Sequence, residues 1–108
     1  MVDTGMRLIR SRTFVEWVRG LKDRQAAIRI ARRVERLGRG AWGDWKNVGG
    51  GVLELRVDYG PGYRIYVANE GTDVVVLLCG GDKRTQASDI LTARRMLSCR
   101  KGNSNEGH

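Results

Sequence analysis

The side chains in this sequence that could do chemistry are cations and phenols, and they gather between Gly51 and Arg84. Arginine, lysine and tyrosine together can bind an RNA backbone and stabilise the extra negative charge of a phosphoryl transition state. The 2′-hydroxyl of RNA can act as an internal nucleophile, so the protein needs to supply only alignment, a weak base and cations around the phosphate. The residues that support this interpretation are Arg56, Tyr63, Arg64, Tyr66, Lys83 and Arg84.

Other catalytic chemistries lack their residues. The only histidine is His108, the last residue, which excludes a paired-histidine ribonuclease mechanism. No pair of acidic residues has the spacing of a two-metal site, and neither Cys79 nor Cys99 has a Cys or His partner at zinc-ligand spacing. The GGDKR sequence after Cys79 lacks the spacing of a P-loop, and no dinucleotide fingerprint occurs. We therefore expect no metal, no other cofactor and no disulfide.

The chain has 108 residues and a formal net charge of +8, which favours a polyanion or an acidic protein as its partner. Its length suits one domain, and an apolar content of 41% favours a folded protein. No apolar run approaches the roughly 20 residues that span a bilayer, and the N-terminus lacks the apolar region of a signal peptide. We therefore expect a cytoplasmic protein that does not bind membranes.

Helices are expected before the cationic cluster, to cover the sheet that carries it. Met6–Arg10 alternates as a first strand does, and Thr13 is the expected N-cap of a short helix. Asp23 is the expected cap of a second helix, which Gly38 and Gly40 end. The expected buried stripes are Phe14, Trp17, Val18 and Leu21 in the first helix, and Ala27, Ile30, Ala31, Val34 and Leu37 in the second.

Four arginines fall on the outer face of the second helix by the same periodicity. Two interpretations stay open: a solvated helix surface, or an electrostatic contact with phosphates or an acidic partner. These residues are Arg29, Arg32, Arg33 and Arg36.

Three strands and a last helix are expected after residues 41–50, which have the composition of a loop. Glycines 80 and 81 are expected to turn the backbone after the last strand. The resulting order is β-α-α-β-β-β-α, an α+β single domain over residues 1–97 with a polar, disordered tail over residues 98–108. The strands are expected at Val52–Val57, Tyr63–Ala68 and Val74–Cys79, and the helix at Gln86–Leu97.

A polar sheet face results if the early helices cover the face of Leu53, Leu55 and Val57. Mixed charged and aromatic side chains on the opposite face would form a polar groove. The alternative is an ordinary wet face on which the glutamate pairs with an arginine across strands. Sequence spacing leaves both open. The polar face carries Glu54, Arg56, Arg64 and Tyr66.

Two segments, GVLELRVDYGPGYRIYV and VVVLLCGGDKRTQASDI, resemble the RelE/ParE toxin superfamily. The closest resemblance is to its branch of addiction-module killer proteins, which are similar to HigB-type toxins, and it extends from about Phe14 to Leu97. It implies a RelE-like, microbial-ribonuclease-like fold with two N-terminal helices on a mainly antiparallel four-stranded sheet and a C-terminal helix. It also implies a type II toxin that cleaves mRNA on the ribosome without metal. Its partner would be a cognate antitoxin, in this branch usually a small helix-turn-helix protein.

The family's functional residues transfer only in part. The arginine of its GYR element falls on Arg64, which would stabilise the phosphorane. Val52 and Glu54 stand where RelE has lysines, residues 89–90 stand where RelE has a tyrosine, and the histidines of well-known HigB proteins are absent. The general acid and base therefore stay open. The expected catalytic residues are Arg64, Tyr66, Lys83 and Arg84, and the expected RNA-binding residues are Lys46, Arg56, Tyr63 and Gln86.

Two further functions remain alternatives. A ParE-like toxin would inhibit DNA gyrase without cleaving RNA, and it would use surface elements in place of a catalytic cluster. The basic cluster favours the nuclease over this alternative. A non-toxic RNA-binding or scaffold protein would cause no growth defect.

Overall fold

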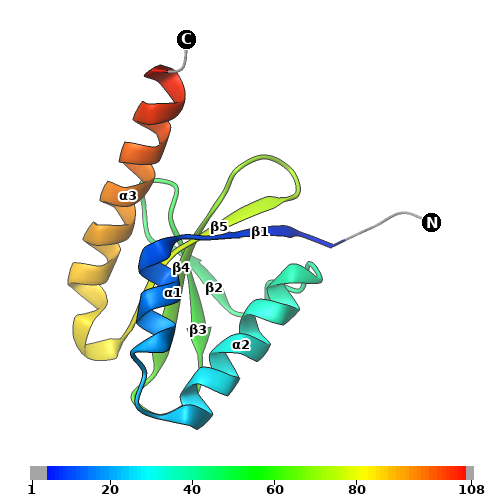
Figure 1. Ribbon diagram of the computed structural model, residues 1–108, viewed down its shortest axis with the longest axis vertical. Coiled ribbons are helices and arrows are strands. Elements are labelled where there is room, and N and C mark those ends of the chain that lie inside the picture. Colours follow the sequence, from blue (N-terminus) through cyan, green and yellow to red (C-terminus); the bar gives the residue numbers. More distant parts are fainter. Residues whose placement is uncertain (1–4, 107–108) are drawn as a thin grey trace.

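The computed structural model describes residues 5–106 of the chain, with side chains through residue 102 (Figure 1). Helices occupy the early and late parts of the chain, and most strands lie between them. The elements are β1 (Arg7–Arg10), α1 (Arg12–Arg19), α2 (Arg24–Gly38), β2 (Trp45–Asn47), β3 (Leu53–Val57), β4 (Tyr63–Asn69), β5 (Val74–Asp82), the 3-10 helix η1 (Lys83–Thr85) and α3 (Gln86–Glu106).

The described strands form one five-stranded mixed sheet in the order β1-β5-β4-β3-β2. β1 lies parallel to β5 at one edge, and the other neighbours are antiparallel. The expected four-stranded sheet is wrong because residues 41–50, expected as a loop, contain β2. Lys46 of β2 pairs with Glu54 of β3, and the glycines at 49–51 that join the two strands all have positive φ. All three residues of β2 are exposed, so pairing with β3, not a hydrophobic pattern, makes this strand.

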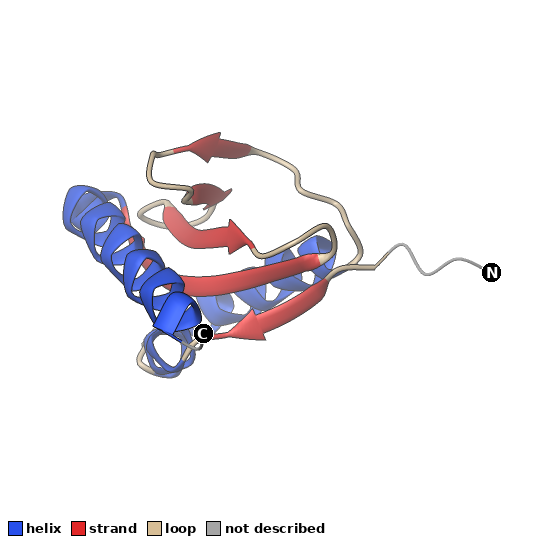
Figure 2. Ribbon diagram, turned by 90° about the horizontal axis from the view of Figure 1, so that it is seen from above, coloured by secondary structure: helices blue, strands red, loops and turns tan. Residues whose placement is uncertain are grey.

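Helices cover both faces of the sheet (Figures 1 and 2). On one face, Phe14 of α1 and Val34 of α2 belong to the same buried cluster as Leu55 of β3. On the other face, Ala93 of α3 belongs to a second cluster with Tyr66 of β4. The face that was expected to be polar and wet is therefore covered by α3.

α1 begins after Ser11, and the expectation that Thr13 is its N-cap is wrong. The Oγ atom of Ser11 accepts a hydrogen bond from the amide of Phe14 at 3.0 Å and donates one to the carbonyl of Leu78 at 2.6 Å. The second bond ties the helix start to β5, a contact that local sequence does not reveal. The N-cap expected at Asp23 is confirmed, since its side chain accepts from two amides of the first turn of α2.

α2 buries a stripe that includes an arginine. Arg33 is only 3% exposed, so its expected place on the outer face is wrong. Ala31, expected in the inner stripe, is exposed. Arg33 lies three residues after the buried Ile30, at the inner edge of the helix, where its guanidinium reaches backbone carbonyls. The buried residues of α2 are Ala26, Ile30, Arg33, Val34 and Leu37.

β5 and α3 both run further than the sequence pattern predicts. β5 continues through Gly80 and Gly81 to Asp82, so these glycines do not turn the chain. A Cβ atom at Gly80 would collide with the ring of Trp17, so the missing side chain makes room for α1. α3 does not end at Leu97, and residues 98–106 of the expected disordered tail are helical, while the last two residues lie outside the described part.

No helix within residues 5–106 combines the length and apolar composition needed to cross a bilayer. Both cysteines are free thiols, and Cys79 is buried while Cys99 is exposed on α3. Burial, together with the nearby charge of Asp89, raises the pKa of the Cys79 thiol to about 12.

Candidate functional site

A buried carboxylate lies at the centre of the predicted cluster. Glu54 of β3 is 0% exposed and pairs across the sheet with Tyr66 of β4. Its Oε2 atom accepts hydrogen bonds from the Tyr66 hydroxyl at 3.1 Å and from Nε2 of Gln86 at 2.8 Å. Nε of Arg64 lies 3.7 Å from the same oxygen, an ion pair that is too long to be a hydrogen bond. One carboxylate therefore gathers three of the residues that the sequence analysis selected.

Burial fixes the protonation of the tyrosine in this cluster. The pKa of Tyr66 is raised far above its ordinary value, first by burial and then by the negative charge of Glu54. The phenol therefore stays protonated at physiological pH and donates to the carboxylate. Oε1 of Glu54 and Nε of Arg64 are buried with no hydrogen-bond partner among the described residues.

Arg64 connects this buried cluster to the surface. It is 9% exposed, and its Nη1 donates to the carbonyl of Gly62 at 2.9 Å. Across the sheet it stands opposite Arg56 of β3 on one side and Gly81 of β5 on the other. Arg56 is exposed, so two cations lie side by side at this end of the sheet.

Tyr63, Lys83 and Arg84 lie around the same end of the sheet, whereas Lys46 of β2 pairs with Glu54 further along β3. Tyr63 of β4 pairs with Asp82 of β5, immediately before Lys83 and Arg84. Arg84 is exposed and forms a 3.0 Å ion pair with Asp82. Lys83 is exposed, as is Lys46 on β2. Within the described residues, none of these cations forms a hydrogen bond or an ion pair with the side chains of the Glu54 cluster.

Neither of the two interpretations left open for this sheet face, a polar groove or a wet face, holds at its centre, although the Glu54–Arg64 pair of the second one is present. Glu54 and Tyr66 are fully buried, because α3 packs over that face and its Ala93 shares a core cluster with Tyr66. Gln86, the first residue of α3, places its amide on the carboxylate. The sequence predicted the residues that share the face but not the helix that covers them.

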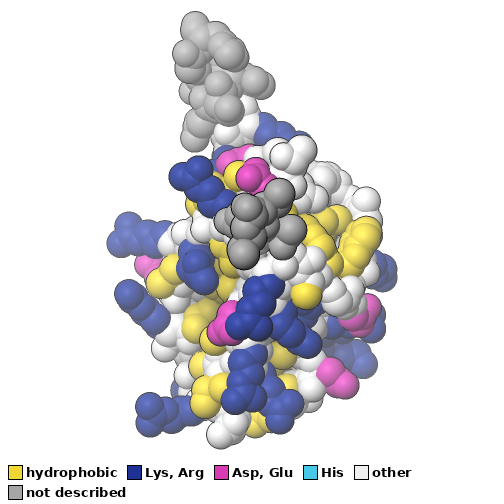
Figure 3. Space-filling view, turned by 90° about the vertical axis from the view of Figure 1, so that its right-hand side faces the viewer, with side chains coloured by type: hydrophobic (Ala, Val, Ile, Leu, Met, Phe, Trp, Pro, Cys, Tyr) yellow, Lys and Arg dark blue, Asp and Glu magenta, His cyan; other side chains and the backbone are white. Residues whose placement is uncertain are grey.

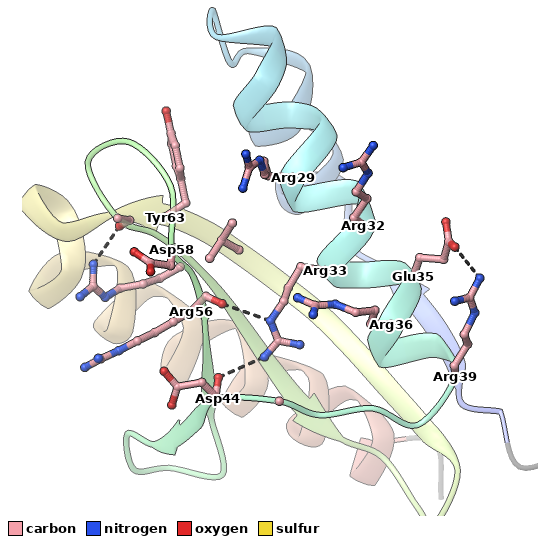
Figure 4. A pocket seen from close by; sticks show the side chains of 14 residues that line it. Arg29, Arg32, Arg33, Glu35, Arg36, Arg39, Asp44, Arg56, Asp58 and Tyr63 are labelled. Atoms are coloured by element: carbon pink, nitrogen blue, oxygen red, sulfur yellow. Dashed lines mark hydrogen bonds and ion pairs between the residues drawn. The ribbon is translucent and has the colours of Figure 1, made fainter.

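A second feature, the arginine cleft, opens between α2 and the β3–β4 hairpin (Figure 4). It has a volume of about 970 Å³ and is lined by seven arginines and three carboxylates. Figure 3 shows Lys and Arg side chains gathered on the side of the molecule that carries α2. The arginines are Arg29, Arg32, Arg33, Arg36 and Arg39 of α2, with Arg56 and Arg64 from the sheet.

Arg33 forms the floor of the arginine cleft. Its Nε donates to the carbonyl of Arg56 at 3.1 Å, and its Nη2 donates to those of Trp42 and Asp44 at 2.5 and 3.1 Å. Burial and the charge of Arg36 lower the pKa of the Arg33 guanidinium from its ordinary value, and Asp44 partly offsets them. The cleft could not be predicted from the sequence, in which the spacing of the arginines on α2 is its only signal.

No three His, Cys, Asp or Glu side chains within the described part of the chain lie close enough to hold a metal ion together.

Comparison with known proteins identifies the family. The sequence profile described as "Phage derived protein Gp49-like (DUF891)" matches residues 16–98. The chain is also 48% identical over 82 residues to an uncharacterized protein of Haemophilus influenzae (strain ATCC 51907 / DSM 11121 / KW20 / Rd), covering 76% of this chain and 83% of that protein. The chain belongs to the Gp49-like family, which is a toxin-like family of the RelE/HigB type.

Proposed function

We propose that this protein is the toxin of a type II toxin–antitoxin system and cleaves mRNA on the ribosome without a metal ion. The observation that supports this most is Arg64, a largely buried cation that keeps 9% of its surface exposed and is paired with the fully buried Glu54. Membership in the Gp49-like family supports the toxin part of the proposal.

The proposed reaction uses the RNA as its own nucleophile. The 2′-oxygen attacks the adjacent phosphorus and loses its proton, the bond to the 5′-oxygen breaks, and that oxygen takes up a proton. Negative charge builds on the non-bridging oxygens, where the guanidinium of Arg64 stabilises it. Arg56, Lys83 and Arg84 are exposed around this point, and they hold the neighbouring phosphates.

Glu54 and Tyr66 act as positioning residues in this scheme. Both are fully buried, so neither contacts RNA directly. The Glu54 carboxylate holds the guanidinium of Arg64 in one orientation. Tyr66 and Gln86 both donate hydrogen bonds to the Oε2 atom of Glu54 and fix that carboxylate in turn. A pre-oriented cation loses less conformational freedom when the transition state forms.

An antitoxin is the expected protein partner. The chain carries a net charge of +8, and such a surface attracts an acidic segment. We propose a small helix-turn-helix protein, produced together with this chain, whose acidic segment covers the cations at the Arg64 end of the sheet.

Primer extension on cellular mRNA tests the nuclease proposal. Wild type, Arg64→Gln and the control Arg95→Gln, which removes one exposed charge from α3, are each induced without antitoxin. Wild type and the control should produce new mRNA 5′ ends within translated regions. On a reporter mRNA, these ends should disappear when its start codon is removed, because the message is then no longer translated. Arg64→Gln should lower the cleavage rate on programmed ribosomes by about 10² or more.

Three results would contradict parts of the proposal. Cleavage by Arg64→Gln at the wild-type rate would show that Arg64 is not in the reaction site. Growth arrest with intact mRNA and an induced SOS response would favour a gyrase inhibitor. Normal growth with intact mRNA would leave a non-toxic RNA-binding protein.

A further inference from the structure

Three arginines of the arginine cleft form a row of uncompensated charge. Arg29, Arg32 and Arg36 are exposed on α2, and no ion pair among the side chains of residues 5–102 involves them. Arg39, by contrast, pairs with Glu35 at 2.7 Å. At 1.5 Å of rise per residue, the row is about 10 Å long. It can therefore contact an extended anion at more than one point.

The floor of the cleft holds a donor without an acceptor. Nη1 of Arg33 is buried and has no hydrogen-bond partner among the described residues, although Nε and Nη2 of the same guanidinium are bonded to carbonyls. Arg33 itself is 3% exposed and lines the cleft. An unsatisfied buried donor is costly, and the charge of this guanidinium adds positive potential to the cleft although its Nη1 atom is not accessible to a ligand.

The cleft and the Glu54 cluster share one residue. Arg64 is among the residues that line the cleft, and its Nε atom pairs with Glu54. An RNA strand with one phosphate on Arg64 would therefore enter the cleft with its next phosphates.

Aromatic rings beside the arginine row favour a nucleic acid over an acidic peptide. The guanidinium of Arg29 lies over the ring of Tyr59, 4.9 Å from its centre, and Tyr63 lines the cleft. Arginines that follow a backbone, beside rings on which bases can stack, are typical of sites for single-stranded nucleic acids.

We propose that the arginine cleft is a binding site for the phosphate backbone of single-stranded RNA, continuous with the reaction site at Arg64. This inference rests on the proposed nuclease function, which gives the strand its place on Arg64. Arg29, Arg32 and Arg36 contact successive phosphates, and the buried Arg33 adds positive potential beneath them. The cleft therefore holds the strand beyond the point of cleavage.

Fluorescence anisotropy with a labelled 12-nucleotide 2′-O-methyl oligouridylate tests the inference. The methyl groups remove the internal nucleophile, so binding is measured without cleavage. The test variant carries glutamine at the three row positions, Arg29, Arg32 and Arg36. The matched control carries glutamine at three exposed arginines outside the cleft lining and has the same net charge; its positions are Arg7, Arg19 and Arg95.

The row variant should bind the oligonucleotide about 10²-fold more weakly than wild type in 0.1 M salt, since each lost phosphate contact lowers the slope of log K against log salt by about 0.7. The slope itself should therefore fall by about 2. The control variant should keep its affinity within about threefold of wild type, because screening at this salt concentration limits the effect of distant charges. Thermal melts of both variants establish that they are folded.

Equal losses of affinity in the two variants would overturn the inference, because net charge alone would then explain binding. Unchanged RNA affinity in the row variant would also overturn it. A row variant that loses only its affinity for a decaglutamate peptide would assign the cleft to an acidic protein instead. Failure of the nuclease proposal is separate, since it appears as intact mRNA with wild-type protein, whatever the oligonucleotide affinities are.

Discussion

Replacing Arg33 with methionine should destabilise the protein strongly, although the sequence pattern places this arginine on a solvated helix face. The guanidinium joins α2 to the carbonyls of Trp42, Asp44 and Arg56. Methionine fills a similar volume with an unbranched apolar chain but donates no hydrogen bond. The substitution therefore removes three hydrogen bonds to backbone carbonyls, of which only the carbonyl of Asp44 keeps another donor outside the strand ladder within the described residues, the amide of Arg56 at 3.3 Å.

The magnitude follows from two opposing effects. A hydrogen bond from a charged donor contributes about 1.5–3 kcal/mol, so three of them contribute roughly 4–9 kcal/mol. Among the described residues, the guanidinium has no carboxylate in hydrogen-bond contact, so its burial costs free energy. Methionine avoids this cost, which offsets the loss of the hydrogen bonds by several kcal/mol. We expect a net loss of about 3 kcal/mol, against a total stability of about 5–15 kcal/mol for a domain. At 4–8 °C per kcal/mol, Tm should fall by roughly 10–25 °C.

Urea denaturation of Arg33→Met beside Arg32→Met measures this loss. Arg32 is the preceding residue, is exposed and has no ion pair among the side chains of residues 5–102, so its substitution should change the free energy of unfolding by no more than about 0.5 kcal/mol. The reasoning is refuted if the two variants have the same stability. That result would mean that the guanidinium of Arg33 is solvated and that the three carbonyls have other donors.

Two further predictions concern stability. Gly80→Ala should lower the free energy of unfolding, measured with urea, by about 1–3 kcal/mol, because the new Cβ would collide with Trp17. The control Gly102→Ala has open space around it in α3 and should be neutral or stabilising by up to about 1 kcal/mol. Equal effects would show that α1 does not pack closely on β5. The raised pKa of Cys79, about 12 in the fold, means that the unfolded chain loses this proton first, so stability present below about pH 9 should decline as pH rises towards 12. The stability of Cys79→Ala should decline less steeply than that of wild type over this range, by up to about 1.4 kcal/mol per pH unit. Native protein should react with iodoacetamide at pH 8 only at Cys99. Rapid labelling of both thiols, or identical pH profiles of the two proteins, would contradict the burial of Cys79.

The order of the main elements could be predicted because each leaves a local signal. Asp23 caps α2 as its sequence position predicts, and the alternating residues around Glu54 and Arg64 lie on adjacent antiparallel strands. β2 could not be predicted, since its three exposed residues have no pattern and depend on pairing with β3. The N-cap at Ser11 likewise depends on a bond to β5.

For the candidate site, the sequence by itself determined which residue types share one sheet face, because side chains alternate along a strand with a fixed period. It therefore placed Arg64, Tyr66 and Glu54 together before any coordinates. Only the tertiary structure decided what covers that face. α3 buries the Glu54 carboxylate, and Arg64 is the partly exposed partner of that carboxylate. α2 places the Arg33 guanidinium on the carbonyl of Trp42, and the arginine cleft forms beside it. These outcomes depend on contacts between residues far apart in the chain, which no local period encodes.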